Sequence, residues 1–144
     1  MNAAEAFFDT NVLLYLLCAD EARADRAEEV IAAGGVISVQ VLNEFASVAT
    51  RKLGMAWVDI REILSDVRAV CRVEPMTGEC HDRGAELAEC HGFQVYDAMI
   101  IASALLAGCT KLYSEYMQDG QQIDERLALQ NPFAATWSPD VSGA

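Results

Sequence analysis

The sequence predicts a three-layer α/β/α fold, with helices on both faces of a short parallel sheet of four to five strands. Short apolar segments alternate with longer segments that have the apolar period of amphipathic helices, which is the pattern of βαβ units. The chain has 144 residues, of which 53% are hydrophobic, so it can bury one core but not two. We therefore expect a single domain over residues 1–138, followed by a frayed tail over residues 139–144.

The N-terminal part of the chain predicts two strands and two helices. Residues 5–8 are apolar and precede Asp9, so we expect a buried strand that ends in a polar turn. Residues 12–18 form an apolar stretch that we expect to be helical. Residues 20–33 are rich in Ala, Glu and Arg and predict a helix that the next two glycines end. Residues 36–37 form a second short strand.

The middle of the chain predicts two more helices and a third strand. Ser38 is a favourable N-cap for a helix that runs to Leu53 and ends at Gly54. Residues 57–70 place apolar side chains on one face of a helix. Residues 71–74 follow as a strand. The expected order therefore continues the alternation of strand and helix.

The C-terminal part of the chain repeats this pattern. A helix over residues 77–92 and a strongly apolar helix over residues 95–107 precede a fourth strand at residues 111–113. Residues 114–122 are polar and predict a loop. Residues 127–129 predict one more short strand. In parallel sheets of this kind, functional sites form beyond the carboxyl ends of the strands.

The charge of the chain sets limits on its partners. The net charge is −12 and the pI is about 4.4, whereas proteins that bind nucleic acids usually carry Lys and Arg for the phosphates. Carboxylates gathered around cations would present positive charge once metal is bound, and an acidic protein suits a basic protein partner. The start of the chain has no targeting signal and the longest apolar run is too short to span a bilayer. We expect a cytoplasmic protein that does not bind membranes.

The cysteines do not indicate a disulfide framework or a zinc site. Their number is five, and an odd number without a secretion signal argues against a set of disulfides. Cys80-His81 and Cys90-His91 consist of residue types that bind zinc, but on one helix Cys80 and Cys90 lie about 15 Å apart along the axis. Zinc ligands converge within about 2.0–2.3 Å of the ion. We therefore expect no zinc site.

Three carboxylates stand where ordinary surface charge is not expected. Asp9 follows an apolar strand, Glu44 lies in a mostly apolar helix start, and Asp97 lies in the first turn of the most apolar helix. A charge in such a setting costs free energy unless it is paired or binds metal. Each also has a simpler explanation. Asp9 can cap the next helix, Asp97 can favour a helix N-terminus through the dipole, and Glu44 can be a partly exposed helix residue.

Together these residues point to metal-assisted chemistry. Clustered carboxylates do not all ionise without a cation between them, and ligand sets of oxygen alone favour Mg²⁺ or Mn²⁺. Such ions assist phosphodiester hydrolysis by polarising a phosphate oxygen and activating water. The alternative is a small-molecule phosphohydrolase of the haloacid dehalogenase type. That motif needs a second Asp two positions after the first, where this chain has Asn11, which cannot act as the general acid.

Four segments resemble the motifs of the PIN-domain family, in the same order and with similar spacing. The segments are Phe7-Phe8-Asp9-Thr10-Asn11-Val12-Leu13, Val41-Leu42-Asn43-Glu44-Phe45, Tyr96-Asp97-Ala98-Met99-Ile100-Ile101-Ala102-Ser103-Ala104, and Leu112-Tyr113-Ser114-Glu115 with Met117-Gln118-Asp119-Gly120-Gln121. The resemblance covers residues 7–133, and it is closest to the VapC-type toxins of bacterial toxin–antitoxin pairs.

The resemblance implies a PIN-like fold and a metal-dependent endoribonuclease that is the toxin of a type II toxin–antitoxin pair. It implies that Asp9, Glu44 and Asp97 are catalytic and coordinate Mg²⁺ or Mn²⁺, and that Glu44 completes the ligand shell or orients the attacking water. Three polar positions would support the site: Thr10, Asn11 and Ser114. The implied partners are an RNA substrate, a small antitoxin that blocks the site, and a second copy of the chain in a homodimer.

The fourth motif departs from the family pattern. Tyr116 stands where the family usually has an Asp after Ser-Glu, and tyrosine is a poor ligand for a hard cation at neutral pH. Asp119 or Glu115 would have to substitute for the missing acid. Three outcomes follow: an active enzyme with three carboxylates, a weakened enzyme, or a catalytically impaired fold that acts by binding RNA or its antitoxin.

Overall fold

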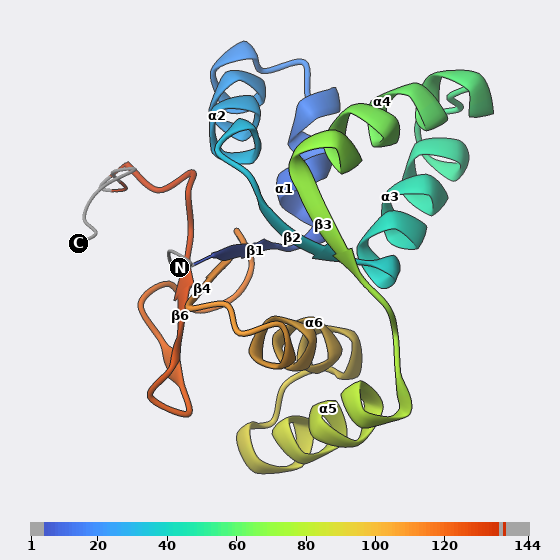
Figure 1. The fold of residues 1–144 in the computed structure, drawn as a ribbon. Coiled ribbons are helices and arrows are strands. Elements are labelled where there is room, and N and C mark those ends of the chain that lie inside the picture. The colour runs from blue at the N-terminus through green and yellow to red at the C-terminus, as the bar shows by residue number, and fades with distance from the viewer. Residues whose placement is uncertain (1–4, 136, 138–144) are drawn as a thin grey trace.

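A mostly parallel sheet forms the middle layer of the molecule (Figure 1). The computed structural model describes residues 5–135 and residue 137, and the expected frayed tail, residues 139–144, lies outside them. Within the described residues the sheet has six strands in the order β3-β2-β1-β4-β6-β5. The strands are β1 (Ala6–Phe8), β2 (Gly35–Ser38), β3 (Cys71–Glu74), β4 (Lys111–Tyr113), β5 (Gln122–Ile123) and β6 (Leu127–Gln130).

The sheet has more strands than the four to five that the sequence predicts. Strands β3, β2, β1, β4 and β6 pair in parallel with one another, as expected. The additional strand is β5, which lies at the edge and pairs antiparallel with β6 through Gln122↔Ala128 and Ile123↔Leu127. Its two residues lie at the boundary of the segment that was expected to be a polar loop. Ile123 is fully buried, so this short strand closes one side of the core.

Helices cover both faces of the sheet, which confirms the three-layer prediction (Figure 1). One face carries α1 (Thr10–Leu14), the 3-10 turn Tyr15–Leu17, α2 (Glu21–Ala32), α3 (Val39–Arg51) and α4 (Trp57–Val70). The other face carries α5 (Gly78–His91) and α6 (Val95–Leu106). Among the described helices, none is both long and apolar enough to cross a membrane.

The helix starts follow from local capping chemistry. The Ser38 hydroxyl accepts a hydrogen bond from the Val41 N–H at 3.3 Å, and the Thr77 hydroxyl accepts one from the Cys80 N–H at 3.0 Å. Helix α1 begins at Thr10 rather than at residue 12, because Asp9 serves as its N-cap. The proposed capping role of Asp9 is therefore real, and it places the Asp9 carboxylate at the start of a helix directly after a strand.

The core lies between the sheet and the two helical layers. Phe7 and Phe8 of β1 are fully buried, and so are Val12 and Leu13 of α1. Helix α6 buries every side chain from Ala98 to Leu105, which explains why its sequence is apolar on all sides. The segments that carry the first and third acidic motifs are therefore anchored in the core.

Candidate functional site

The sheet brings the first and fourth motifs together at the carboxyl ends of its central strands. Strands β1 and β4 are paired in the register Phe8↔Tyr113. The next residue along each strand is Asp9 and Ser114 respectively, and both are buried. The site thus forms where parallel α/β sheets generally place their chemistry.

Asp9 is held at both oxygens of its carboxylate. Oδ1 accepts a hydrogen bond from the Thr10 N–H at 2.7 Å, while Oδ2 accepts from the Ser114 hydroxyl at 2.9 Å and from the Asn11 side-chain amide at 3.2 Å. The side chain is only 7% exposed. Burial raises the pKa of Asp9 from 3.8 to about 6; the hydrogen bonds from Ser114 and Thr10 oppose this rise, and the charges of Asp97 and Glu44 add to it.

Glu44 is half-buried and is also held at both oxygens. Its Oε1 accepts a hydrogen bond from the Thr10 hydroxyl at 2.5 Å, and its Oε2 accepts from the Gln40 side chain at 3.1 Å. Gln40 also donates to the backbone carbonyl of Tyr96 at 3.2 Å. Gln40 therefore connects the second motif to the third. Gln40 was not among the site residues predicted from the sequence, although its position four residues before Glu44 on one helix face could have indicated it.

Asp97 completes the set of three carboxylates from distant segments. It lies in the first turn of α6, where the Gln94 side chain accepts hydrogen bonds from the N–H groups of Tyr96 and Asp97. Burial, followed by the charge of Glu44, raises the pKa of Asp97. Because Asp97 and Glu44 also act on Asp9, all three carboxylates lie within electrostatic reach of one another.

The chemistry of this donor set fits a divalent cation. The donors are carboxylate oxygens, which Mg²⁺ and Mn²⁺ prefer. Without a counter-ion, the charge of each carboxylate disfavours the ionisation of its neighbours. Across residues 5–135 and 137, no three acidic, histidine or cysteine side chains converge tightly enough to ligate one ion as they stand. A bound cation would therefore have to draw the three carboxylates closer together.

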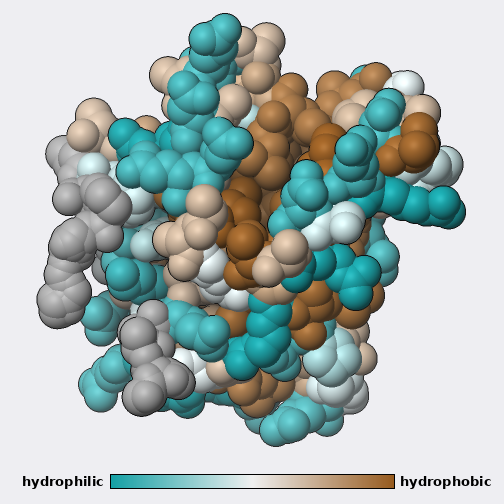
Figure 2. Space-filling model, turned by 45° about the horizontal axis from the view of Figure 1, so that its top comes forward, coloured by the Kyte–Doolittle hydropathy of each residue, from teal (hydrophilic) through white to brown (hydrophobic). Residues whose placement is uncertain are grey.

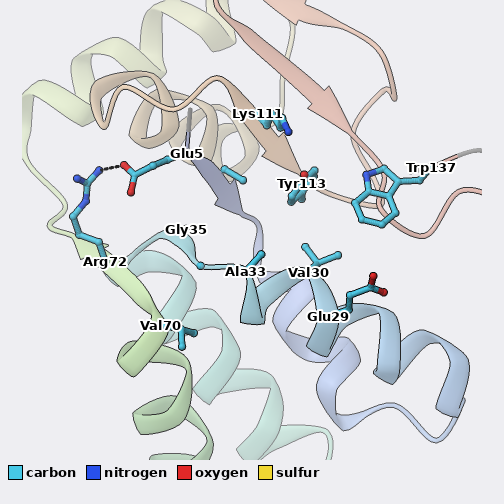
Figure 3. Close-up of a pocket in the computed structure, with 12 residues that line it drawn as sticks. Glu5, Glu29, Val30, Ala33, Gly35, Val70, Arg72, Lys111, Tyr113 and Trp137 are labelled. Atoms are coloured by element: carbon cyan, nitrogen blue, oxygen red, sulfur yellow. Dashed lines mark ion pairs between the residues drawn. The ribbon is translucent and has the colours of Figure 1, made fainter. Parts of the chain in front are cut away.

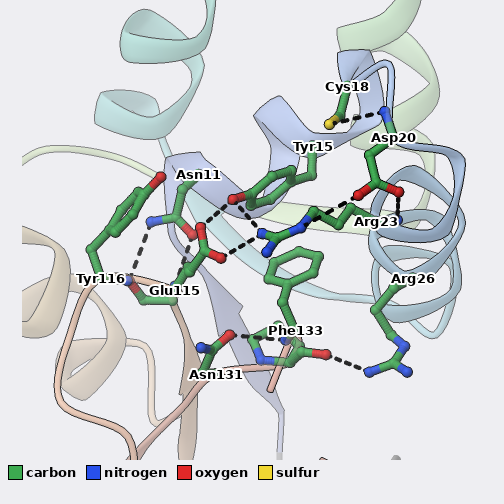
Figure 4. A network of polar contacts seen from close by, with 12 residues as sticks. Asn11, Tyr15, Cys18, Asp20, Arg23, Arg26, Glu115, Tyr116, Asn131 and Phe133 are labelled. Atoms are coloured by element: carbon green, nitrogen blue, oxygen red, sulfur yellow. Dashed lines mark hydrogen bonds and ion pairs between the residues drawn. The ribbon is translucent and has the colours of Figure 1, made fainter. Parts of the chain in front are cut away.

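The fourth motif is arranged around Glu115 rather than around Tyr116 (Figure 4). Glu115 accepts hydrogen bonds from the Tyr15 hydroxyl and from Arg23 Nη1, the latter at 2.6 Å, and its backbone N–H donates to Asn11 Oδ1 at 3.0 Å. Burial raises the pKa of Glu115, but the hydrogen bonds from Tyr15 and Arg23 outweigh it, so the pKa is lowered. This network anchors the loop after β4 to α1 and α2.

The two carboxylates considered as substitutes for the missing acid have other partners here. Glu115 is bound to Tyr15 and Arg23, and Asp119 Oδ1 accepts the backbone N–H of Asn131 at 2.9 Å. Either residue would have to give up these bonds to reach a metal. Their role as substitutes stays a prediction that this arrangement does not favour. Tyr15 and Arg23 carry no local signal in the sequence, since they contact Glu115 across about 100 and 92 residues.

A separate hollow lies at the opposite edge of the sheet (Figure 3). It has a volume of about 560 Å³ and is lined by residues at the amino ends of the parallel strands, among them Ala6, Gly35 and Lys111. An ion pair between Arg72 and Glu5, at 3.1 Å, crosses its rim. The three carboxylates lie beyond the carboxyl ends of the same strands, so this hollow is not the candidate site.

The fold and the site together define an α/β protein with a carboxylate cluster at the carboxyl edge of its sheet. The sequence profile of the PIN domain matches residues 6–117, and the chain belongs to the PIN-domain family. Nucleases of this family generally use divalent metal ions. Comparison with curated protein sequences gave no significant match.

Solved structures of toxin–antitoxin proteins have a similar fold. A toxin–antitoxin complex from Klebsiella pneumoniae is 20% identical, with a TM-score of 0.67 over 89% of this chain and 98% of that chain. VapC20 of Mycobacterium tuberculosis, described as a toxin that cleaves the sarcin–ricin loop, is 24% identical, with a TM-score of 0.59 over 81% and 91%. VapBC2 of Rickettsia felis, bound to a DNA fragment from its promoter, is 19% identical, with a TM-score of 0.62 over 88% and 97%.

Proposed function

We propose that the chain is a metal-dependent endoribonuclease and the toxin of a type II toxin–antitoxin pair. The observation that carries the proposal is that Asp9, Glu44 and Asp97, from three distant segments, lie within electrostatic reach of one another near the carboxyl ends of the strands. Membership of the PIN-domain family and the similarity in fold to toxin–antitoxin proteins support it.

Each residue of the site has a distinct task in this proposal. Asp9, Asp97 and Glu44 hold Mg²⁺ or Mn²⁺, which when bound polarises a phosphate oxygen and lowers the pKa of water. Ser114 and the Thr10 N–H fix the Asp9 carboxylate, while Gln40 and the Thr10 hydroxyl fix Glu44. Glu44 completes the ligand shell or orients the attacking water. No covalent protein nucleophile is needed for this hydrolysis.

A small antitoxin and a second copy of the chain are the proposed protein partners. The net charge of −12 suits a basic segment that would lie over the carboxylates and block them. The toxin–antitoxin complexes of similar fold support an antitoxin partner. Co-expression with the product of an adjacent short gene, followed by size-exclusion chromatography with light scattering, tests both the pairing and the homodimer.

A second candidate function follows from Tyr116. Its side chain is 77% exposed and supplies no carboxylate, while Glu115 is bound elsewhere. In this second candidate, a chain with three carboxylates is impaired in catalysis and acts by binding RNA or its antitoxin. The distinction lies in whether three carboxylates suffice for cleavage.

Cleavage of a mixed pool of structured RNA by the purified, partner-free chain tests the proposal. The reaction is run with Mn²⁺, with Mg²⁺ and with chelator, using Asp9→Asn as the negative control and Tyr116→Asp as the gain-of-function variant. We expect metal-dependent cleavage that Asp9→Asn abolishes. Cleavage by Tyr116→Asp alone would favour the impaired fold, and cleavage by neither protein would contradict the catalytic proposal for these RNAs.

A further inference from the structure

A second hollow adjoins the carboxylate site on the face that carries α1 to α4. It has a volume of about 300 Å³ and opens between α1, the 3-10 turn, α3 and the loop after β4. Its walls are mostly apolar and include Leu14, Leu17, Val48 and Leu53. Figure 2 turns the layer of α1 to α4 toward the reader and shows apolar side chains gathered between hydrophilic ones on that face. Such a surface suits a flat apolar group better than an ion.

Tyr116 forms one wall of this hollow and connects it to the carboxylate site. The ring is 77% exposed although it is large and aromatic. The Tyr116 N–H lies 3.4 Å from the Ser114 hydroxyl oxygen, and that hydroxyl donates to Asp9. Asn11 also lines the hollow and donates to Asp9. Tyr116 and Asn11 lie side by side in Figure 4, and both connect the hollow to Asp9. A ligand bound in the hollow would therefore lie next to the carboxylate site.

The surrounding charge favours contact with an uncharged part of a nucleic acid. The chain carries 22 acidic and 10 basic residues, so it has few cations for phosphate contacts. Arg23, the cation in the network beside this hollow, is paired with Glu115 at 2.6 Å and with Asp20 at 3.7 Å. Stacking of a base on an aromatic ring needs no positive charge and tolerates any base.

We propose that this hollow binds one unpaired nucleobase of the RNA substrate, stacked on the Tyr116 ring beside the carboxylates. The inference rests on the proposed ribonuclease function and deepens it by naming the part of this chain that would receive a base next to the carboxylates. Tyr116 then serves as a specificity-determining residue. The exposed ring, the apolar walls and the shared residue Asn11 join the subsite to the site of hydrolysis.

Binding of RNA in the absence of metal tests this subsite without cleavage. The probe is a short, fluorescently labelled single-stranded RNA of random sequence, titrated in chelator and followed by anisotropy. We expect Tyr116→Ala to weaken binding by at least about fivefold and Tyr116→Phe to bind like the unaltered chain, since stacking needs only the ring. Trp57→Ala, which removes another exposed aromatic ring on α4, is the matched control and should leave the affinity unchanged.

A ribose-phosphate strand without bases identifies the contact as stacking. We expect this strand to bind the unaltered chain more weakly than RNA does, and to show no further loss with Tyr116→Ala, because both changes remove the same contact. Equal RNA affinities of Tyr116→Ala and the unaltered chain would overturn the proposal. So would a loss with Tyr116→Phe as large as with Tyr116→Ala, because that result would indicate a hydroxyl contact instead.

Cleavage of the same RNA with Mn²⁺, measured in parallel, separates the two proposals. Binding that depends on Tyr116 without any cleavage would leave the base subsite in place and contradict the catalytic function. If cleavage depends on metal while Tyr116→Ala changes neither the RNA affinity nor the cleavage rate, the ribonuclease function is upheld and the base subsite is overturned. If Tyr116→Ala weakens the binding of a basic antitoxin but leaves the RNA affinity unchanged, the base subsite is likewise overturned. The hollow is then assigned to a side chain of the antitoxin.

Discussion

The Thr10 hydroxyl donates a hydrogen bond to Glu44 Oε1 at 2.5 Å, across 34 residues of sequence. The Thr10 N–H donates to Asp9 at 2.7 Å, so one buried residue orients the first two acidic motifs. Thr10 is 7% exposed, which keeps water from competing for either bond. The distance between the two carboxylates is thus fixed by the side chain and the backbone of a single threonine.

Replacing Thr10 by valine should loosen Glu44 while leaving the volume of the side chain nearly unchanged. A hydrogen bond to a charged acceptor contributes about 1.5–3 kcal/mol, so we expect weaker Mn²⁺ binding and slower RNA cleavage. Thr50→Val is the matched control, because the Thr50 hydroxyl bonds the Ala46 carbonyl of its own helix at 2.9 Å. Equal cleavage rates for the two variants would contradict the positioning role of Thr10.

The raised pKa of Asp9 makes the metal-free fold sensitive to pH. The pKa is about 6 in the folded chain against an ordinary value of 3.8, so the folded state binds the proton more tightly than the unfolded state. The contribution of protonated Asp9 to stability is therefore fully present below about pH 4 and is lost as the pH rises through about 6. In chelator at neutral pH, we expect Asp9→Asn to raise the free energy of unfolding, by up to about 3 kcal/mol.

Urea unfolding of the unaltered chain and Asp9→Asn at about pH 4 and about pH 7 measures this difference. The stabilisation should be present at neutral pH and small at acidic pH. Asp66→Asn, which changes an exposed aspartate on α4, should show no such contrast. Destabilisation by Asp9→Asn at both pH values would mean that its hydrogen bonds outweigh the cost of its burial.

Glu115 should show the opposite dependence on pH. Its pKa is lowered because Tyr15 and Arg23 donate to the carboxylate, which outweighs the effect of burial. Its contribution to stability is therefore present at neutral pH and is lost as the pH falls through its folded pKa. We expect Glu115→Gln to lower the free energy of unfolding at neutral pH by about 1 kcal/mol, and by less in acid.

Thermal unfolding at the two pH values provides the measurement for Glu115→Gln. Glu86→Gln is the control, because Glu86 pairs with Arg83 at 3.2 Å on the surface and its side chain is 66% exposed. A surface pair of this kind contributes little. A loss of stability for Glu115→Gln that does not change with pH would contradict the role of its charge.

Gly35 lies at a close approach of two strands, and alanine should not fit there. A Cβ atom at Gly35 would come within 2.5 Å of the Ala6 carbonyl oxygen and 2.8 Å of the Phe8 ring. We expect Gly35→Ala to cost about 1–3 kcal/mol in urea unfolding. Gly78→Ala, at the start of α5 with open space around the added methyl, should be neutral or slightly stabilising. Equal stabilities would contradict the packing of β1 against β2.

Local signals in the sequence account for the elements that were predicted well. Helix α4 and strands β3 and β4 have the bounds that apolar period and turn residues indicate. Strand β5 was not predicted, because two residues carry no period of their own and the strand exists only through its pairing with β6. The core strands therefore follow from composition, whereas the edge strand depends on a tertiary contact.

The candidate site likewise contains residues that have a signal in the local sequence and residues that have none. Asp9, Glu44 and Asp97 could be selected because each charge stands in an apolar setting. Thr10 and Ser114, which bond to Glu44 and Asp9, were expected only through the family resemblance. Arg23, the partner of Glu115, was not expected, because it lies 92 residues away and has no periodic relation to that residue. Carboxylates in costly apolar settings can therefore be recognised in the sequence, whereas the distant residues that bond to them show no local signal.

Titration of Mn²⁺ into the metal-free chain by calorimetry is the most direct test of the carboxylate cluster as a metal site. We predict binding that weakens as the pH falls through about 6, because a proton on Asp9 competes with the ion. Binding should be lost in Asp9→Asn and retained in Asp66→Asn. Equal Mn²⁺ binding by the unaltered chain and Asp9→Asn, or no binding by either, would contradict the assignment of Asp9, Glu44 and Asp97 as metal ligands.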